Sequence, residues 1–219
     1  MLLKIIIRNK WFFLPYFVIV ILIIMALLHF SKAGIHIFFN RYYSDFADVF
    51  FSYITNPGNG IFLPLFILIM LFFSIRYSIL MVLGFLASGL VVQLIKHLVL
   101  YDSLRPSKYF ENIYPLHLVN GIQQLNYHSF PSGHSATAFC VFLCFALISG
   151  NNLVKLIMLV FASIIAYSRV YLSQHFMIDI LAGSLIGVIV TLIIYLWINT
   201  LTYSWLNKKI MIFKTNTIV

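Results

Sequence analysis

The chain has 219 residues, of which 63% are hydrophobic and only 9% are charged, with 14 Lys and Arg against 5 Asp and Glu. This composition excludes an ordinary soluble domain and is typical of a helical protein that crosses a membrane several times. The net charge of +9 does not indicate a nucleic-acid partner, because the basic residues are scattered as short flanks of apolar segments.

Six apolar runs predict six transmembrane helices, so the expected fold class is an all-α polytopic membrane protein. Some runs are shorter than the roughly 20 residues that cross a hydrocarbon core, and their helices must extend into the flanking residues. No internal repeat is evident, and residues 1–219 are expected to form a single membrane domain. The predicted spans are 11–30, 61–75, 77–100, 135–149, 153–167 and 176–197.

The segments between these spans are polar or mixed. Residues 45–54 alternate acids with Phe and Tyr, which predicts a short helix lying in the membrane interface. Residues 56–60 read Asn-Pro-Gly-Asn-Gly and predict a turn, as do Gly150, Asn151 and Asn152. The stretch 101–133 is the longest polar segment, and its prolines interrupt helices.

The start of the chain and its two cysteines suggest no further function. Residues 1–10 are basic, but the apolar run after them is long enough to span and lacks a small-residue cleavage site, so no cleaved signal peptide is expected. Cys140 and Cys144 are four apart in an apolar run. A disulfide there would strain a helix and two ligands do not make a zinc site, so both are predicted to be packing residues.

The basic residues predict the orientation of the chain. Six spans place both termini on one side, and if that side is the cytoplasm it collects eight basic residues and no acid, as the positive-inside rule requires. The same topology brings the other basic residues and all five acids to the outer side, including the polar stretch 101–133. The eight inner residues are Lys4, Arg8, Lys10, Arg76, Lys155, Lys208, Lys209 and Lys214.

Ionisable residues near the last span form the first candidate cluster. Arg169, His175 and Asp179 lie among apolar residues, where charged groups are costly and usually functional. On a helix His175 and Asp179 share one face, so Asp179 can fix the tautomer of His175 and leave its other nitrogen free as a base or nucleophile. The planar guanidinium group of Arg169 can donate two parallel hydrogen bonds to the oxygens of a phosphate. The alternative is a structural Arg–Asp ion pair with a bystander histidine.

Two more clusters lie at the same membrane boundary. Ser132, Gly133 and His134 precede the fourth span, where the N–H groups of a helix start favour an anion and His134 is a possible proton donor. The alternative is a capped helix with an interfacial histidine. Lys96 and Arg105 add two cations to this boundary. The alternative is that their long side chains only extend to the membrane surface, with their charged ends in water.

Together the clusters resemble the type 2 phosphatidic acid phosphatase superfamily. That family has a Lys followed by Arg-Pro, then Pro-Ser-Gly-His, then Ser-Arg, five residues, His, three residues and Asp. Residues 131–134 match the second motif and residues 168–179 match the third in full. In the first motif eight residues separate Lys96 from Arg105, where the family usually has six; an extra half-turn or a bulge would restore the position of Lys96. The resemblance covers residues 96–183.

The resemblance implies a mechanism through a phosphohistidine. His175 would attack phosphorus, Asp179 would orient it, and His134 would protonate the leaving oxygen and then activate water. The phosphate would be bound by Lys96, Arg105, Ser132, Gly133 and Arg169. The transition state of phosphoryl transfer spreads negative charge over three oxygens, and fixed cations and the N–H groups of a helix start can stabilise that charge.

No cofactor is expected, and the chemistry is predicted to be independent of metal. Only Asp102 and Glu111 stand in the outer polar stretch, and two acids are too few to hold Mg²⁺ or Zn²⁺. His97, His117 and His128 could contact a headgroup, although such residues are more often interfacial side chains.

The expected substrate is a lipid with its phosphate at headgroup level, since the site lies at a membrane boundary. A soluble haloperoxidase, which shares this anion site, does not fit so hydrophobic a chain. Candidates are lipid A phosphates, undecaprenyl pyrophosphate, phosphatidic acid and phosphatidylglycerol phosphate, with the protein in a bacterial inner membrane and its site facing the periplasm. The alternatives are a lipid phosphotransferase and a non-catalytic lipid-binding or lipid-flipping protein. The oligomeric state and the headgroup do not follow from the sequence.

Overall fold

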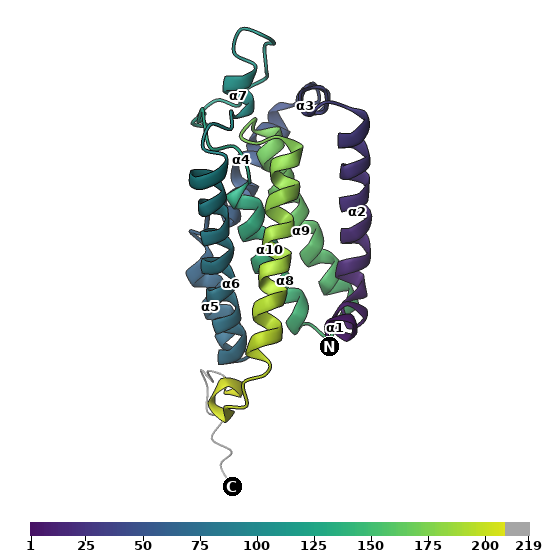
Figure 1. Cartoon of the computed structure of the whole chain (residues 1–219), viewed down its shortest axis with the longest axis vertical. Helices are drawn as coiled ribbons and strands as arrows, with labels where there is room; N and C mark the ends of the chain where they lie inside the picture. The colour runs from purple at the N-terminus through teal and green to yellow at the C-terminus, as the bar shows by residue number, and fades with distance from the viewer. Residues whose placement is uncertain (209–219) are drawn as a thin grey trace.

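The computed structural model describes residues 1–208, which form helices and connecting loops and contain no β-strand. The long helices run side by side along one axis, while α3 and α7 lie at the upper end of the bundle (Figure 1). The elements are α1 (Leu2–Arg8), α2 (Lys10–His29), α3 (Lys32–Asn40), α4 (Asp45–Ile54), the 3₁₀ turn η1 (Asn56–Asn59), α5 (Leu63–Leu71), α6 (Ile75–Leu94), the π-helix η2 (Ile95–Val99), α7 (Pro106–Tyr109), α8 (Gly133–Ile148), α9 (Asn152–Tyr171), α10 (Met177–Ile198) and the 3₁₀ turn η3 (Ser204–Asn207).

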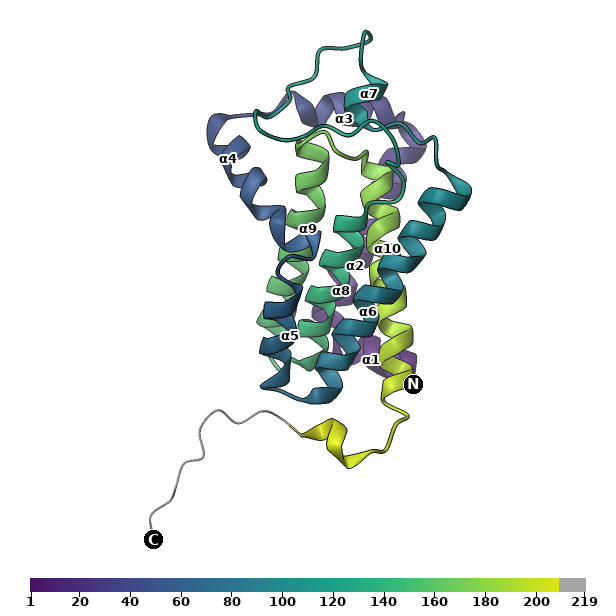
Figure 2. The same ribbon diagram turned by 90° about the vertical axis from the view of Figure 1, so that its left-hand side faces the viewer.

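Helix α8 is the centre of the bundle, because α6, α9 and α10 all pack against it. Most of its side chains are buried. In Figure 2 it lies behind α6 and between α9 and α10. The first turn of α8 is therefore enclosed on several sides at the upper end of the bundle.

Two glycines allow α10 to approach α8 closely. A methyl group added at Gly183 would lie 2.3 Å from the carbonyl oxygen of Ser132, and one added at Gly187 would lie 2.4 Å from that of Ala136. Small residues four apart are a common means of close helix packing in membranes. Their position fixes the start of α10 against the start of α8.

Five of the predicted spans correspond to long helices, with ends shifted by a few residues. Four of these helices, namely α2, α6 with η2, α9 and α10, are long and apolar enough to cross a membrane. Helix α8 is also apolar, but it has 16 residues and is shorter than a standard span. Cys140 and Cys144 are buried in it and not disulfide-bonded, as predicted for packing residues.

The predicted span 61–75 contains only the nine-residue helix α5. It reaches the length of a span only together with α4 and η1, from which it is bent by 62°. Helix α4 has the predicted bounds, but it slopes down toward α5 and does not lie across the end of the bundle (Figure 2). The reason is its packing, since Phe51 contacts Tyr167 and Tyr171 of α9.

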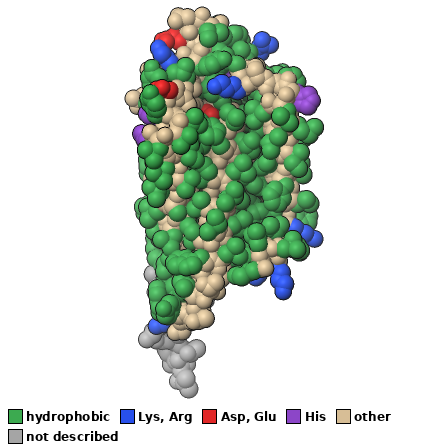
Figure 3. Space-filling model, viewed as in Figure 1, with side chains coloured by type: hydrophobic (Ala, Val, Ile, Leu, Met, Phe, Trp, Pro, Cys, Tyr) green, Lys and Arg blue, Asp and Glu red, His purple; other side chains and the backbone are tan. Residues whose placement is uncertain are grey.

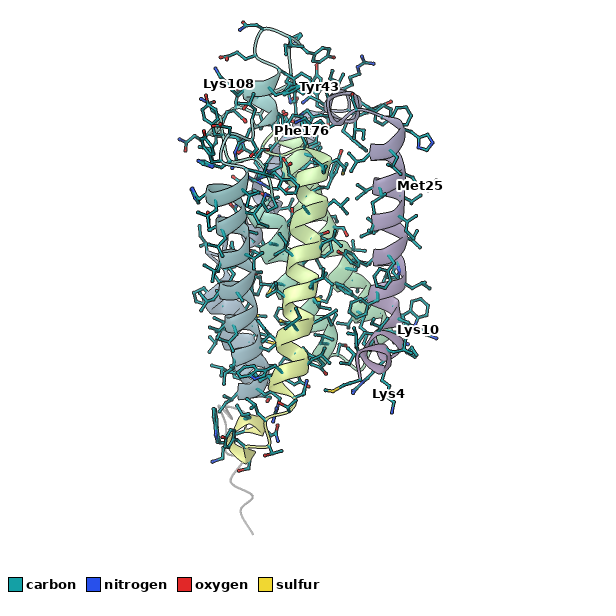
Figure 4. The ribbon with its side chains drawn as sticks, viewed as in Figure 1. Lys4, Lys10, Met25, Tyr43, Lys108 and Phe176 are labelled. Carbon is teal, nitrogen blue, oxygen red and sulfur yellow. The ribbon has the colours of Figure 1, made fainter. Side chains whose placement is uncertain are left out.

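Charged side chains gather at the two ends of a largely hydrophobic surface (Figure 3). Lys4 and Lys10 lie at the lower end and Lys108 at the upper end (Figure 4). Lys155 donates to the carbonyl of Arg8 at 2.8 Å, so it also lies at the lower end. The predicted inner residues Lys209 and Lys214 lie outside the described part of the chain.

The glycine contact predicts the effect of one added methyl group. Gly183→Ala should lower the stability by roughly 1–3 kcal/mol, because the new Cβ forces α10 away from the Ser132 carbonyl. Thermal unfolding in detergent would measure this. Gly89→Ala in α6 is the matched control, since nothing lies within 4 Å of its added Cβ. Equal melting temperatures for the two variants would contradict the proposed tight contact.

Candidate active site at the upper end of the bundle

Asp179 lies in the first turn of α10 and is held by two hydrogen bonds. Its Oδ2 accepts from the backbone N–H of Phe176 at 2.8 Å and from the hydroxyl of Ser129 at 2.5 Å. The first bond caps the start of α10, and the second ties this helix to the loop before α8. Asp179 is 2% exposed, so its carboxylate is fixed within the protein.

His175 precedes α10, so the prediction that it shares a helix with Asp179 was wrong. The helix begins at Met177, because Asp179 caps the backbone at Phe176. The two side chains still meet, with Nδ1 of His175 lying 3.5 Å from Oδ2 of Asp179. This is an ion-pair distance, and Nδ1 has no hydrogen-bond partner within residues 1–208. The predicted bond that fixes the tautomer is therefore not formed.

Arg105 faces the other nitrogen of His175. Its Nη1 lies 3.4 Å from Nε2 of His175 and donates to the backbone carbonyl of Gln174 at 3.0 Å. Its Nε donates to the carbonyl of Tyr127 at 2.9 Å. Arg105 is 6% exposed and comes from the loop before α7. These bonds hold a buried cation beside the nitrogen that would attack phosphorus.

Arg169 lies in the last turn of α9 and is held by the segment between α4 and η1. Its Nη1 donates to the hydroxyl of Thr55 at 2.9 Å, while its Nε is buried without a partner in the described residues. The backbone carbonyl of Arg169 accepts from the N–H groups of Gln174 and His175, and Arg105 donates to the carbonyl of Gln174, so the two arginines meet at the same turn. Two buried cations at close range favour an anion between them.

The helix start of α8 forms another side of the site. Ser132 is its N-cap, and its hydroxyl oxygen accepts from the backbone N–H of Ser135 at 3.3 Å. The backbone N–H of Ser132 donates to the carbonyl of Asp179 at 3.0 Å, which joins α8 to α10. Gly133 and His134 follow in the first turn, where helix N–H groups attract negative charge.

His134 belongs to the same cluster of side chains. The charges of Arg169, His175 and Arg105 all act on it. The turn η1 contacts it from below, since a methyl group added at Gly58 would lie 3.3 Å from Cβ of His134. His134 therefore lies with the two arginines and the candidate nucleophile, as a proton donor to a leaving group would have to.

Lys96 lies in the π-helix η2 at the end of α6. A π-helix adds a residue to a turn and often occurs at functional sites. It corresponds to the bulge considered for the unusual spacing between Lys96 and Arg105. Lys96 is 9% exposed, and the charges of Arg105, Asp179 and Arg169 act on it. The structure thus brings Lys96 toward the other cations in spite of the longer spacing.

Four residues that support the site were not predicted from the sequence. Thr55 binds Arg169, Gly58 contacts His134, Ser129 binds Asp179, and Gln174 binds Arg105. Ser129 and Gln174 are adjacent to or within the motifs, so their place in the chain could have indicated them. Thr55 and Gly58 lie more than 70 residues from the second motif, and only the folded chain shows that they belong to the site.

His117, one of the possible headgroup contacts, is engaged elsewhere. Its Nε2 lies 2.9 Å from Oδ2 of Asp48, and its ring stacks on Tyr43 at 3.9 Å between centroids. Among residues 1–208 no group of three or more His, Cys, Asp or Glu side chains could hold a metal ion.

Comparisons with known proteins identify the family and the fold of the chain. The model of the PAP2 superfamily matches residues 77–203. The crystal structure of LpxE from Aquifex aeolicus is similar, with a TM-score of 0.66 and 25% identity over 74% of this chain and 93% of that one. The first transmembrane PAP2 type phosphatidylglycerolphosphate phosphatase from Bacillus subtilis has a TM-score of 0.63 and 23% identity, over 90% and 98% of the chains. No curated protein matches the sequence significantly.

The bond between Thr55 and Arg169 predicts a loss of anion affinity on mutation. Thr55→Val keeps the shape of the side chain but removes the hydroxyl that positions Arg169. A hydrogen bond to a charged group contributes roughly 1.5–3 kcal/mol, so the affinity for vanadate should fall about tenfold or more. Calorimetric titration with vanadate would measure it. Thr200→Val, which removes an exposed hydroxyl that donates to the carbonyl of Trp197, should leave the affinity unchanged.

Proposed function

The chain belongs to the PAP2 superfamily and is an integral-membrane lipid phosphatase, and on this premise we propose that it removes a phosphate from an envelope lipid through a phosphohistidine. The observation that carries the proposal is the pair of contacts around His175. Asp179 lies 3.5 Å from its Nδ1, and Arg105 lies 3.4 Å from its Nε2. A histidine held between a carboxylate and a guanidinium is suited to attack a phosphate bound by that guanidinium.

In the proposed reaction, Nε2 of His175 forms a bond to phosphorus as the bond to the leaving lipid oxygen breaks. His134 gives its proton to that oxygen. The neutral His134 then takes a proton from water, whose oxygen attacks phosphorus and breaks the P–N bond, releasing inorganic phosphate. Lys96, Arg105 and Arg169, with Ser132 and the Gly133 amide, bind the phosphate oxygens in both steps.

Asp179 has a defined part in this reaction. Once His175 is phosphorylated, its ring is positively charged, and a fixed carboxylate 3.5 Å away stabilises that charge. Ser129 and the Phe176 amide hold the carboxylate where it is needed, so it does not have to move during the reaction.

We further propose that six segments cross the membrane, with both termini in the cytoplasm and the site facing outward. The long helices supply four spans, α8 a fifth, and the bent α4–η1–α5 segment a sixth. The described basic residues at the lower end then face the cytoplasm. A site at the outer end of a bacterial inner membrane would meet lipid A phosphates, undecaprenyl pyrophosphate or glycerophospholipid phosphates in the outer leaflet.

The surroundings of His175 predict the pH dependence of the reaction. Burial, followed by the charges of Arg105, Arg169 and Lys96, lowers the pKa of His175 well below 6.5. The nucleophile is the unprotonated ring, so on the acid side of the profile kcat/KM should fall as the pH falls through this lowered pKa, below pH 6.5. Lys96→Met removes one of the cations and should move this acid limb to higher pH. The pH profile of kcat/KM measures the shift.

Lys108→Met serves as the control for the pH profile. Lys108 lies in α7 at the upper end of the bundle, pairs with Glu111, and is not among the cations that act on His175. Its removal should leave the acid limb in place. An acid limb that does not move in Lys96→Met would disprove the electrostatic role of Lys96.

Phosphate release from a panel of lipids tests the proposed function. The purified protein is offered lipid A, undecaprenyl pyrophosphate, phosphatidylglycerol phosphate and phosphatidic acid, each with and without EDTA. Release should continue in EDTA and disappear in His175→Ala, whose folding is checked by its melting temperature. Loss in EDTA with recovery in Mg²⁺ would refute the metal-independent mechanism. Phosphate appearing on an acceptor lipid would indicate transfer, and no reaction with any lipid would indicate a binding protein.

A further inference from the structure

Two histidines from distant segments pair at the upper end of the bundle. His97 belongs to the π-helix η2, and His128 belongs to the loop that leads to α8. Their ring centroids are 4.8 Å apart and their planes are inclined by 48°. His97 is exposed and His128 is half-buried, so the pair lies where the protein meets its surroundings. The mechanism proposed above uses neither of them.

The pair lies beside the candidate active site. His97 directly follows Lys96, one of the buried cations. His128 directly precedes Ser129, whose hydroxyl donates to Asp179 at 2.5 Å. Lys96 and Ser129 are two site residues 33 positions apart, and each has one of these histidines as its neighbour in the chain.

The backbone is unusual at both histidines. His97 lies in a π-helix, and His128 has a φ of 57°, in the left-handed region that residues other than glycine rarely adopt. Such conformations have a cost and concentrate at functional sites. In addition, Nδ1 of His128 is buried without a hydrogen-bond partner among residues 1–208. A buried polar atom without a partner is unfavourable in the free protein, and a ligand that supplies one removes that cost.

The charges nearby favour an anion over a metal ion. Lys96 directly precedes His97, and the charges of Arg105 and Arg169 act on Lys96. None of these three cations forms a salt bridge within the described residues. A divalent cation would be repelled by them, and the pair offers only two ligands. An imidazole, in contrast, can donate an N–H to a phosphate oxygen, and it becomes a cation when protonated.

We propose that His97 and His128 form a second phosphate subsite, which binds the inner phosphate of a lipid diphosphate whose terminal phosphate lies at His175. This inference rests on the proposed function and specifies its substrate class. His175 attacks the terminal phosphorus, the bridging P–O bond breaks, and His134 protonates the bridging oxygen. The leaving group is a lipid monophosphate, and the two imidazoles stabilise its negative charge. A lipid monophosphate lacks the group that would occupy this subsite.

The test compares a lipid diphosphate with the monophosphate of the same polyprenyl chain. His97→Gln and His128→Asn keep polar side chains, and Asn tolerates the left-handed backbone at position 128. The ratio of kcat/KM for the diphosphate to that for the monophosphate should fall about tenfold in each variant, as expected for the loss of a hydrogen bond to a charged group. His29→Gln is the matched control, because His29 is an exposed histidine at the upper end of α2.

Binding of inorganic pyrophosphate and inorganic phosphate gives a readout without turnover. Wild-type protein should bind pyrophosphate more tightly than phosphate, and the difference should largely disappear in His97→Gln with His128→Asn. An unchanged substrate ratio, or an unchanged difference in affinity, would overturn the subsite. If the wild type released phosphate from neither lipid, the proposed function would fail, and the pyrophosphate titration would still decide the subsite.

Discussion

The close contact between α8 and α10 is the constraint on which the site depends. At Gly183 the two backbones are so close that an added methyl group would lie 2.3 Å from the carbonyl oxygen of Ser132. The hydrogen bond from the N–H of Ser132 to the carbonyl of Asp179 lies in the same contact. This bond places the start of α8, where we propose that the phosphate binds, directly beside the start of α10, which carries the carboxylate of Asp179. His175 is then fixed between them by the short turn that precedes α10.

The remaining parts of the site are cations collected around this contact. Lys96, Arg105 and Arg169 are buried, yet within residues 1–208 none of them forms a salt bridge with an acid. Buried cations without an anion are unfavourable for stability. Neutral groups hold the two arginines instead, namely the hydroxyl of Thr55 and backbone carbonyls such as that of Gln174. The fold thus keeps its positive charge available for a phosphate.

The sequence predicted the long helices and the motif residues, because apolar run length and ordered motifs are properties of the chain itself. It did not predict that His175 lies outside α10, since the end of that helix is set by the bond of Asp179 to Phe176. The contact of Gly58 with His134 and the bond of Thr55 to Arg169 join distant segments, and no local pattern reveals them. The bend between α4 and α5 also depends on the packing of α4 against α9. A hydropathy profile does not show which helices pack together, so the sequence could not predict this bend.

The short length of α8 has a consequence for the depth at which the reaction occurs. Its 16 residues extend roughly 24 Å, whereas the hydrocarbon core of a bilayer is about 30 Å thick. In the proposed topology, with the other end of α8 at the inner boundary of the core, the helix start proposed to bind the phosphate lies several ångströms beneath the surrounding headgroups. The proposed lipid substrate would then have to sink toward the bilayer centre for its phosphate to reach His175. The cations, the Ser132 hydroxyl and the Gly133 amide of the proposed site would replace the lost hydration. Water for the second half of the proposed reaction would have to follow the same path.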